Sequence, residues 1–166
     1  MWACAEVFDI EGVTLRYFNV FGPGQDPASF YAAVIPKFVT AALADEAPTI
    51  HGDGGQTRDF TYIDNVVEAN LRAAEADAAA VNGRTFNVGC GERISVNRLW
   101  TEIRELTGAS VEADHGPARP GDVRDSLADV SPLVEATGWE PSVELREGLR
   151  RTVAWYGKQR TGAVAT

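Results

Sequence analysis

Two arginines stand in patterns that suit the binding of a diphosphate. Arg58 follows a glycine-rich stretch in GDGGQTRDF (52–60), and Arg119 precedes Pro120-Gly121-Asp122. A guanidinium group can bind two phosphate oxygens at once. Asp122 stands three residues after Arg119 across a turn, where its carboxylate suits ribose hydroxyls. Spacing alone also fits a surface pair of Arg58 with Asp59, and an ordinary surface turn at RPGD.

Two further segments end apolar stretches with residues that could contact a ligand. RYFN (16–19) places Tyr17 and Asn19 at the end of an apolar stretch, and open α/β sheets bind ligands at such strand ends. GCGERI (89–94) resembles the start of a dinucleotide fingerprint, but Ile94 stands in place of the third glycine. We therefore interpret it as a structural turn between a strand and a helix.

No catalytic or metal-binding set is visible in the sequence. No tyrosine has a lysine four residues later, and no serine, histidine and carboxylate form a motif. A lone histidine such as His51 does not indicate a metal site or a catalytic base. The sequence therefore assigns no catalytic residue and no metal.

The elements that would position these side chains alternate between strand and helix. Such alternation predicts an α/β fold with parallel pairing. Segments 13–21 and 84–90 are apolar almost throughout, as strands buried on both faces tend to be. Ser95 and Gly108 are expected to cap one helix, Asp64 or Asn65 another and Ser131 a third. The expected strands are 13–21, 48–52, 58–63, 84–90 and 111–116; the expected helices are 30–44 with a break near Pro36, 66–80, 96–108, 131–138 and 143–159.

Composition excludes several classes of function. The net charge of −9 argues against nucleic acid as a partner. No apolar run approaches the ~20 residues that span a bilayer, and no signal segment opens the chain, so we expect no membrane partner and a cytoplasmic location. The two cysteines, Cys4 and Cys90, are expected to stay reduced.

Three segments together resemble a known family. LRYFNVFGPGQ (15–25), GDGGQTRDFTYID (52–64) and ARPGDVRDSLAD (118–129) resemble the C-terminal half of NAD-dependent nucleotide-sugar epimerases and dehydratases, the extended short-chain dehydrogenases/reductases. The similarity is closest to the UDP-hexose and UDP-N-acetylhexosamine 4-epimerases. The resemblance implies the last strands and helices of a Rossmann-like NAD domain at 1–24 and 63–110. It also implies a small α/β nucleotide-sugar lobe at 25–62 and 111–158, with a frayed tail at 159–166.

The resemblance also implies roles for single residues. One departure from the family pattern is Gly24, which stands where relatives commonly have an arginine in GPRQ. The implied contacts are Asn19 with the diphosphate, Ala33, Val34 and Phe38 with uracil, Ile50 and His51 with uridine, Arg58 and Arg119 with the pyrophosphate, Asp122 with ribose, and Tyr17 with the nicotinamide of NAD.

The family's GxxGxxG fingerprint and YxxxK pair are not present in these 166 residues. The resemblance therefore implies a chain that binds a UDP-sugar or other nucleotide-sugar but neither holds NAD well nor catalyses alone. The leading reaction for the complete protein is UDP-glucose or UDP-N-acetylglucosamine 4-epimerisation, and a homodimer fits the family. The alternatives are dTDP- or GDP-sugar 4,6-dehydration, a non-catalytic nucleotide-sugar-binding module, and a split enzyme completed by another polypeptide.

Overall fold

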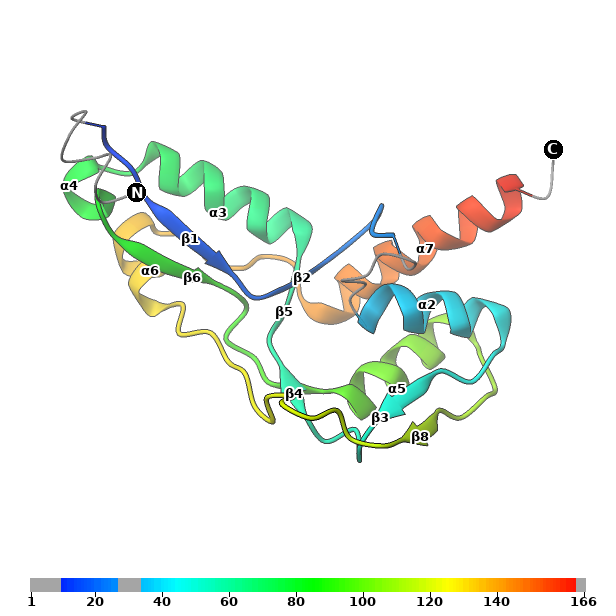
Figure 1. Cartoon of the computed structure of the whole chain (residues 1–166). Coiled ribbons are helices and arrows are strands. Elements are labelled where there is room, and N and C mark those ends of the chain that lie inside the picture. The colour runs from blue at the N-terminus through cyan, green and yellow to red at the C-terminus, as the bar shows by residue number, and fades with distance from the viewer. Residues whose placement is uncertain (1–9, 27–33, 164–166) are drawn as a thin grey trace.

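The computed structural model is an α/β structure that describes residues 10–26 and 34–163, with side chains to residue 160. Helices and strands alternate along most of the chain (Figure 1), as the sequence predicts. The strands are β1 (Thr14–Tyr17), β2 (Asn19–Phe21), β3 (Thr49–His51), β4 (Thr57–Arg58), β5 (Phe60–Tyr62), β6 (Thr85–Val88), β7 (Ile94–Ser95) and β8 (Asp114–Gly116). The helices are α2 (Val34–Ala44), α3 (Ile63–Glu75), α4 (Ala78–Val81), α5 (Val96–Thr107), α6 (Ser131–Thr137) and α7 (Leu145–Ala163).

The strands form short pairs, most of them parallel. β1 pairs with β6, β2 with β5 and β3 with β8, all in parallel, whereas β4 and β7 are antiparallel. The predicted strand 13–21 breaks at Phe18. The Phe18 N–H donates to the Val88 carbonyl, whereas the next N–H, of Asn19, donates to the Asp59 carbonyl. The chain thus leaves one partner strand for another. The expected parallel pairing is confirmed, but the single long strand is not.

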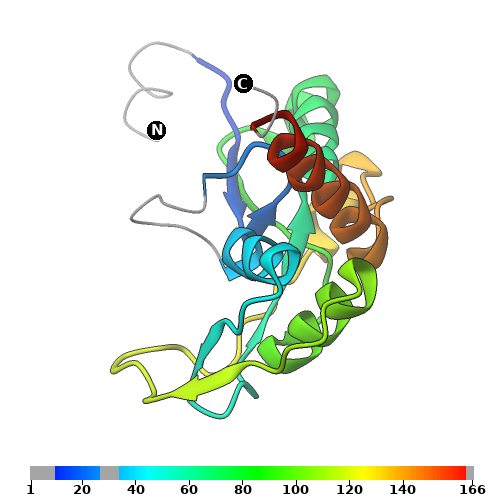
Figure 2. The ribbon, with the colours of Figure 1, turned by 90° about the vertical axis from the view of Figure 1, so that its right-hand side faces the viewer.

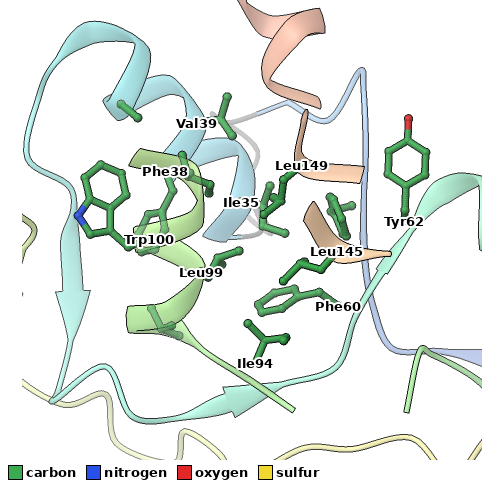
Figure 3. Packing of buried hydrophobic residues seen from close by; sticks show 14 of the residues in the cluster. Ile35, Phe38, Val39, Phe60, Tyr62, Ile94, Leu99, Trp100, Leu145 and Leu149 are labelled. Atoms are coloured by element: carbon green, nitrogen blue, oxygen red, sulfur yellow. The ribbon is translucent and has the colours of Figure 1, made fainter. Parts of the chain in front are cut away.

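Two hydrophobic clusters hold these elements together. The larger lies among α2, α5, α7 and nearby strands and includes Phe38, Leu99, Trp100 and Leu149 (Figure 3). The other packs α3, α4 and α6 around β6, with Trp139 only 1% exposed.

The clusters cut across the division expected from the sequence. The sequence assigns α5 to the remnant of the NAD domain, but α5 packs on α2 and α7. It assigns α6 to the nucleotide-sugar lobe, but α6 packs on β6. Helical periodicity predicts an apolar face but not the element that covers it. Figure 2 shows α2, α5 and α7 close together, with the segment after β8 projecting away from them.

The helix ends differ from the predictions in several places. Ser95 caps α5 as expected, since its Oγ accepts a hydrogen bond from the Arg98 N–H at 3.1 Å. Tyr62 occupies the cap position of α3 without a side-chain hydrogen bond, and Val130 rather than Ser131 precedes α6. The predicted helix 66–80 is interrupted between α3 and α4. α7 continues to Ala163, beyond its expected end at residue 159, so part of the expected frayed tail is helical.

The strand β1 is less buried than its apolar sequence predicts. Tyr17 is 48% exposed, whereas Phe86 and Val88 in the neighbouring β6 are buried. The expectation that both strands are covered on both faces is therefore wrong for β1 in this chain. Within the described residues, no helix combines the length and apolar character needed to cross a membrane.

Candidate functional site

A cavity of about 480 Å³ lies where α2, β3 and β4 meet the loop after β8. Segments far apart in the sequence line it, because the parallel β3–β8 pair brings that loop beside β4. The lining residues are Asn19, Val34, Lys37, Phe38, Ala41, Pro48, Thr49, Ile50, His51, Gln56, Arg58, Val96, Arg119 and Asp122.

Eight of the nine residues expected to bind the nucleotide-sugar line this one cavity: Asn19, Val34, Phe38, Ile50, His51, Arg58, Arg119 and Asp122. Ala33, the ninth, lies outside the described residues. Tyr17, expected beside the nicotinamide, lies outside the cavity, and its hydroxyl donates to Asn70 Oδ1 at 2.9 Å.

One part of the cavity wall is apolar and firmly packed. The Phe38 ring is 2% exposed and meets the Trp100 ring edge to face, with centroids 5.4 Å apart (Figure 3). Ile50 in β3 is also 2% exposed. Such a wall suits a flat ring such as a nucleobase, because it offers fixed apolar contact area.

Another part of the wall carries positive charge. Arg58, Arg119 and Lys37 line the cavity, against Asp122 as the one carboxylate among the lining residues. The Arg58 side chain is 18% exposed and forms an ion pair with Asp122, and its Nη1 donates to the Thr57 carbonyl at 2.7 Å. Arg119 is exposed, and its side chain makes no hydrogen bond or ion pair with the described residues. In a chain of net charge −9, this gathering of cations favours an anionic ligand.

Asp59, next to Arg58, has a structural role. Its carboxylate is fully buried and accepts hydrogen bonds from the N–H groups of Cys90 at 2.7 Å, Gly91 at 2.9 Å and Ala128 at 3.1 Å. The surface pair between Arg58 and Asp59, considered from spacing alone, does not form. The amides of the 89–91 turn are occupied by Asp59, which confirms the structural interpretation of that turn.

The burial of Cys90 leads to a prediction about its reactivity. Burial raises the pKa of the Cys90 thiol, and the charge of Asp59 raises it further, while the Asn65 amide, whose Nδ2 donates to the sulfur at 3.8 Å, opposes both. Since the thiolate is the reactive form, Cys90 in a Cys4→Ser variant should react with iodoacetamide at pH 8 more slowly than glutathione does. Equal rates would show that the thiol is neither buried nor shielded.

His51 and Gln56 also line the cavity wall. His51 Nδ1 lies 3.3 Å from the Pro117 carbonyl, and Gln56 Nε2 donates to the His51 carbonyl at 2.9 Å. No group of three potential metal ligands occurs among the residues that the structure describes. His51 is therefore placed as a wall residue with a polar edge.

Three notable wall residues were not predicted from the sequence: Lys37, Gln56 and Val96. Lys37 lies one helical turn after Val34, so helical spacing could have placed it on the same face. Gln56 stands two residues before Arg58 in the glycine-rich segment. Val96 carried no local signal, because it reaches the cavity through the antiparallel pairing of β7 with β4.

The comparisons with known proteins agree with this fold. The chain belongs to the NAD dependent epimerase/dehydratase family, whose model matches residues 1–89. It is 39% identical over 150 residues to UDP-glucose 4-epimerase of Mycolicibacterium smegmatis, covering 90% of this chain and 47% of that protein. The chain therefore spans about half the length of the curated relatives it matches.

Two solved structures match nearly the whole chain. The Thermotoga maritima UDP-glucose 4-epimerase, crystallised with UDP-glucose, is 40% identical with a TM-score of 0.88, covering 94% of this chain and 49% of that one. A UDP-N-acetylglucosamine 4-epimerase of Methanobrevibacter ruminantium, in complex with UDP-N-acetylmuramic acid, is 42% identical with a TM-score of 0.88 and coverages of 95% and 50%. The predicted fold class, part of an extended short-chain dehydrogenase/reductase, is confirmed.

Proposed function

We propose that the cavity binds the nucleoside diphosphate of a UDP-sugar. The observation that carries the proposal is a single cavity with a packed apolar wall and three cations, lined by residues from five separate segments of an acidic chain. The names of the relatives support the choice of a UDP-sugar as ligand. All of the lining residues belong to this chain, so binding can be tested on it directly.

The wall suggests how the ligand would lie. The base would rest on the apolar wall formed by Phe38, Val34 and Ile50. The two phosphates would meet the guanidinium groups of Arg58 and Arg119. Asp122 and Asn19 would then face the polar groups between base and sugar, with the hydroxyls of ribose donating to the carboxylate.

A resident NAD does not fit the glycine turn at 89–91. Its amides at Cys90 and Gly91 already donate to buried Asp59, so this turn has no such donors to offer a pyrophosphate. A contact of Tyr17 with the nicotinamide remains a proposal. We infer that 4-epimerisation is the activity of the complete protein and that this chain contributes nucleotide-sugar binding without turnover of its own.

Calorimetric titration of the chain with UDP, UMP and ADP tests the proposal. A charge-assisted hydrogen bond contributes about 1.5–3 kcal/mol, so loss of the β-phosphate contacts should make UMP about 10- to 150-fold weaker than UDP. ADP should also bind more weakly, because its larger base meets the same fixed wall. Equal binding of UDP and UMP, or no binding of UDP, would overturn the proposal.

A further inference from the structure

The turn that carries Arg119 and Asp122 lies in a segment, 117–126, that is attached at both ends and, between them, by the ion pair of Asp122 with Arg58. At the first end, the Gly52 N–H donates to the Gly116 carbonyl at 2.9 Å, and His51 contacts the Pro117 carbonyl. At the second end, the Thr57 N–H donates to the Arg124 carbonyl at 2.8 Å and the Ser126 N–H to the Thr57 carbonyl at 3.2 Å. The position of the turn therefore depends on these attachments.

A bidentate ion pair reinforces the second end. Arg124 Nη1 lies 2.6 Å from Asp53 Oδ1, and Nη2 lies 3.0 Å from Oδ2. Asp53 is itself fixed, because its Oδ1 accepts a hydrogen bond from the Gly55 N–H at 2.9 Å. These contacts lower the pKa of Asp53 to about 2, with the Arg124 hydrogen bond the largest cause. The pair thus links the glycine-rich loop before β4 to a residue two positions after Asp122.

The glycine-rich loop makes room for this pair. A Cβ at position 55 would lie 2.6 Å from Arg124 Nη2, closer than real contacts allow. The Arg124 guanidinium can occupy this position because residue 55 is a glycine. Asp53 and Arg124 do not line the cavity, so any influence on a ligand must pass through the turn.

We propose that the Asp53–Arg124 pair is a positioning device that holds the Arg119–Asp122 turn against the cavity. The proposal rests on the diphosphate site proposed above. Both side chains are well exposed, at 65% and 60%, and exposed pairs contribute little to global stability. The effect should therefore appear in the affinity for phosphate groups and leave the thermal unfolding midpoint nearly unchanged.

The test compares UDP with uridine as ligands of Asp53→Asn, Arg124→Gln, the double variant and Gly55→Ala. Each should bind UDP roughly 3- to 30-fold more weakly than the parent, the range typical of coupled neighbours. The double variant should be no weaker than the worse single variant, because both remove the same contact. Gly55→Ala displaces Arg124 without removing a charge. Uridine affinity should not change, since uridine has no phosphate for Arg119 to contact.

Arg72→Gln is the matched control, because the Arg72–Glu68 pair on α3 is similarly exposed (53% and 43%) and has a 2.8 Å separation. If the parent binds UDP and all four variants bind it as Arg72→Gln does, the positioning role is wrong while the diphosphate site stands. If the variants lose as much affinity for uridine as for UDP, the pair supports the whole cavity and the proposal is overturned. If the parent itself fails to bind UDP, the proposed function fails and this inference with it.

Discussion

Replacing Arg58 or Arg119 by alanine is expected to weaken UDP binding about 10- to 150-fold for each arginine. Each guanidinium lines the charged part of the cavity, and each charge-assisted hydrogen bond to phosphate contributes about 1.5–3 kcal/mol. Arg58→Ala should have the larger effect, because it also leaves the Asp122 carboxylate without its cation, facing the phosphates. Calorimetry with UDP measures both variants and their combination.

Two controls make this result specific. UDP-glucose should lose as much affinity as UDP, because the arginines contact phosphates and not the hexose, while uridine should lose almost none. Arg72→Ala, on the distant face of α3, should bind UDP as the parent does. Variants of Arg58 and Arg119 that bind UDP as well as Arg72→Ala does would mean that both arginines are surface charges.

Asp59→Ala is expected to cause the largest loss of stability. The substitution leaves three backbone N–H groups, of Cys90, Gly91 and Ala128, without their acceptor in a buried site. An unsatisfied buried group costs about 1–3 kcal/mol, so the free energy of unfolding should fall by at least about 3 kcal/mol. That is a large part of the 5–15 kcal/mol typical of a domain. Urea unfolding followed by tryptophan fluorescence gives the value.

Asp129→Ala is the matched control for Asp59→Ala. Asp129 is exposed, and its carboxylate accepts a hydrogen bond from the Ser131 N–H at 3.1 Å. Water can replace that contact, so the loss of stability should stay within about 1 kcal/mol. Similar unfolding curves for the two variants would contradict the structural role of Asp59.

The neighbours Arg58 and Asp59 show what the sequence could and could not predict. The position of Arg58 after a glycine-rich loop, together with the family resemblance, predicts a ligand-binding residue, and Arg58 does line the cavity. Nothing local distinguishes Asp59 as buried, because its partners lie 31 to 69 residues away along the chain. Long-range contacts of this kind depend on the tertiary fold and leave no periodic pattern.

Long-range contacts also explain why one helix end was predicted incorrectly. Asn65 was a plausible cap for α3 by residue type, but its side chain is buried and bonds to the backbone of Ser142 and Val143. The Asn65 side chain thus binds the backbone at Ser142 and Val143 and does not cap the helix, although its residue type favours the cap position. The cap at Ser95 is predicted correctly because the group that it binds, the Arg98 N–H, lies only three residues away.

The proposal that the cavity binds a nucleoside diphosphate is tested most directly by mapping the backbone amide chemical shifts of the chain during titration with UDP. We expect the shifts to concentrate at the cavity, with Asn19, Phe38, Ile50, Arg58 and Arg119 among the affected amides. We also expect no change at Cys90 and Gly91, because their amides remain bonded to Asp59. Shifts centred on the 89–91 turn, or no shift at Arg58 and Arg119, would contradict the proposal.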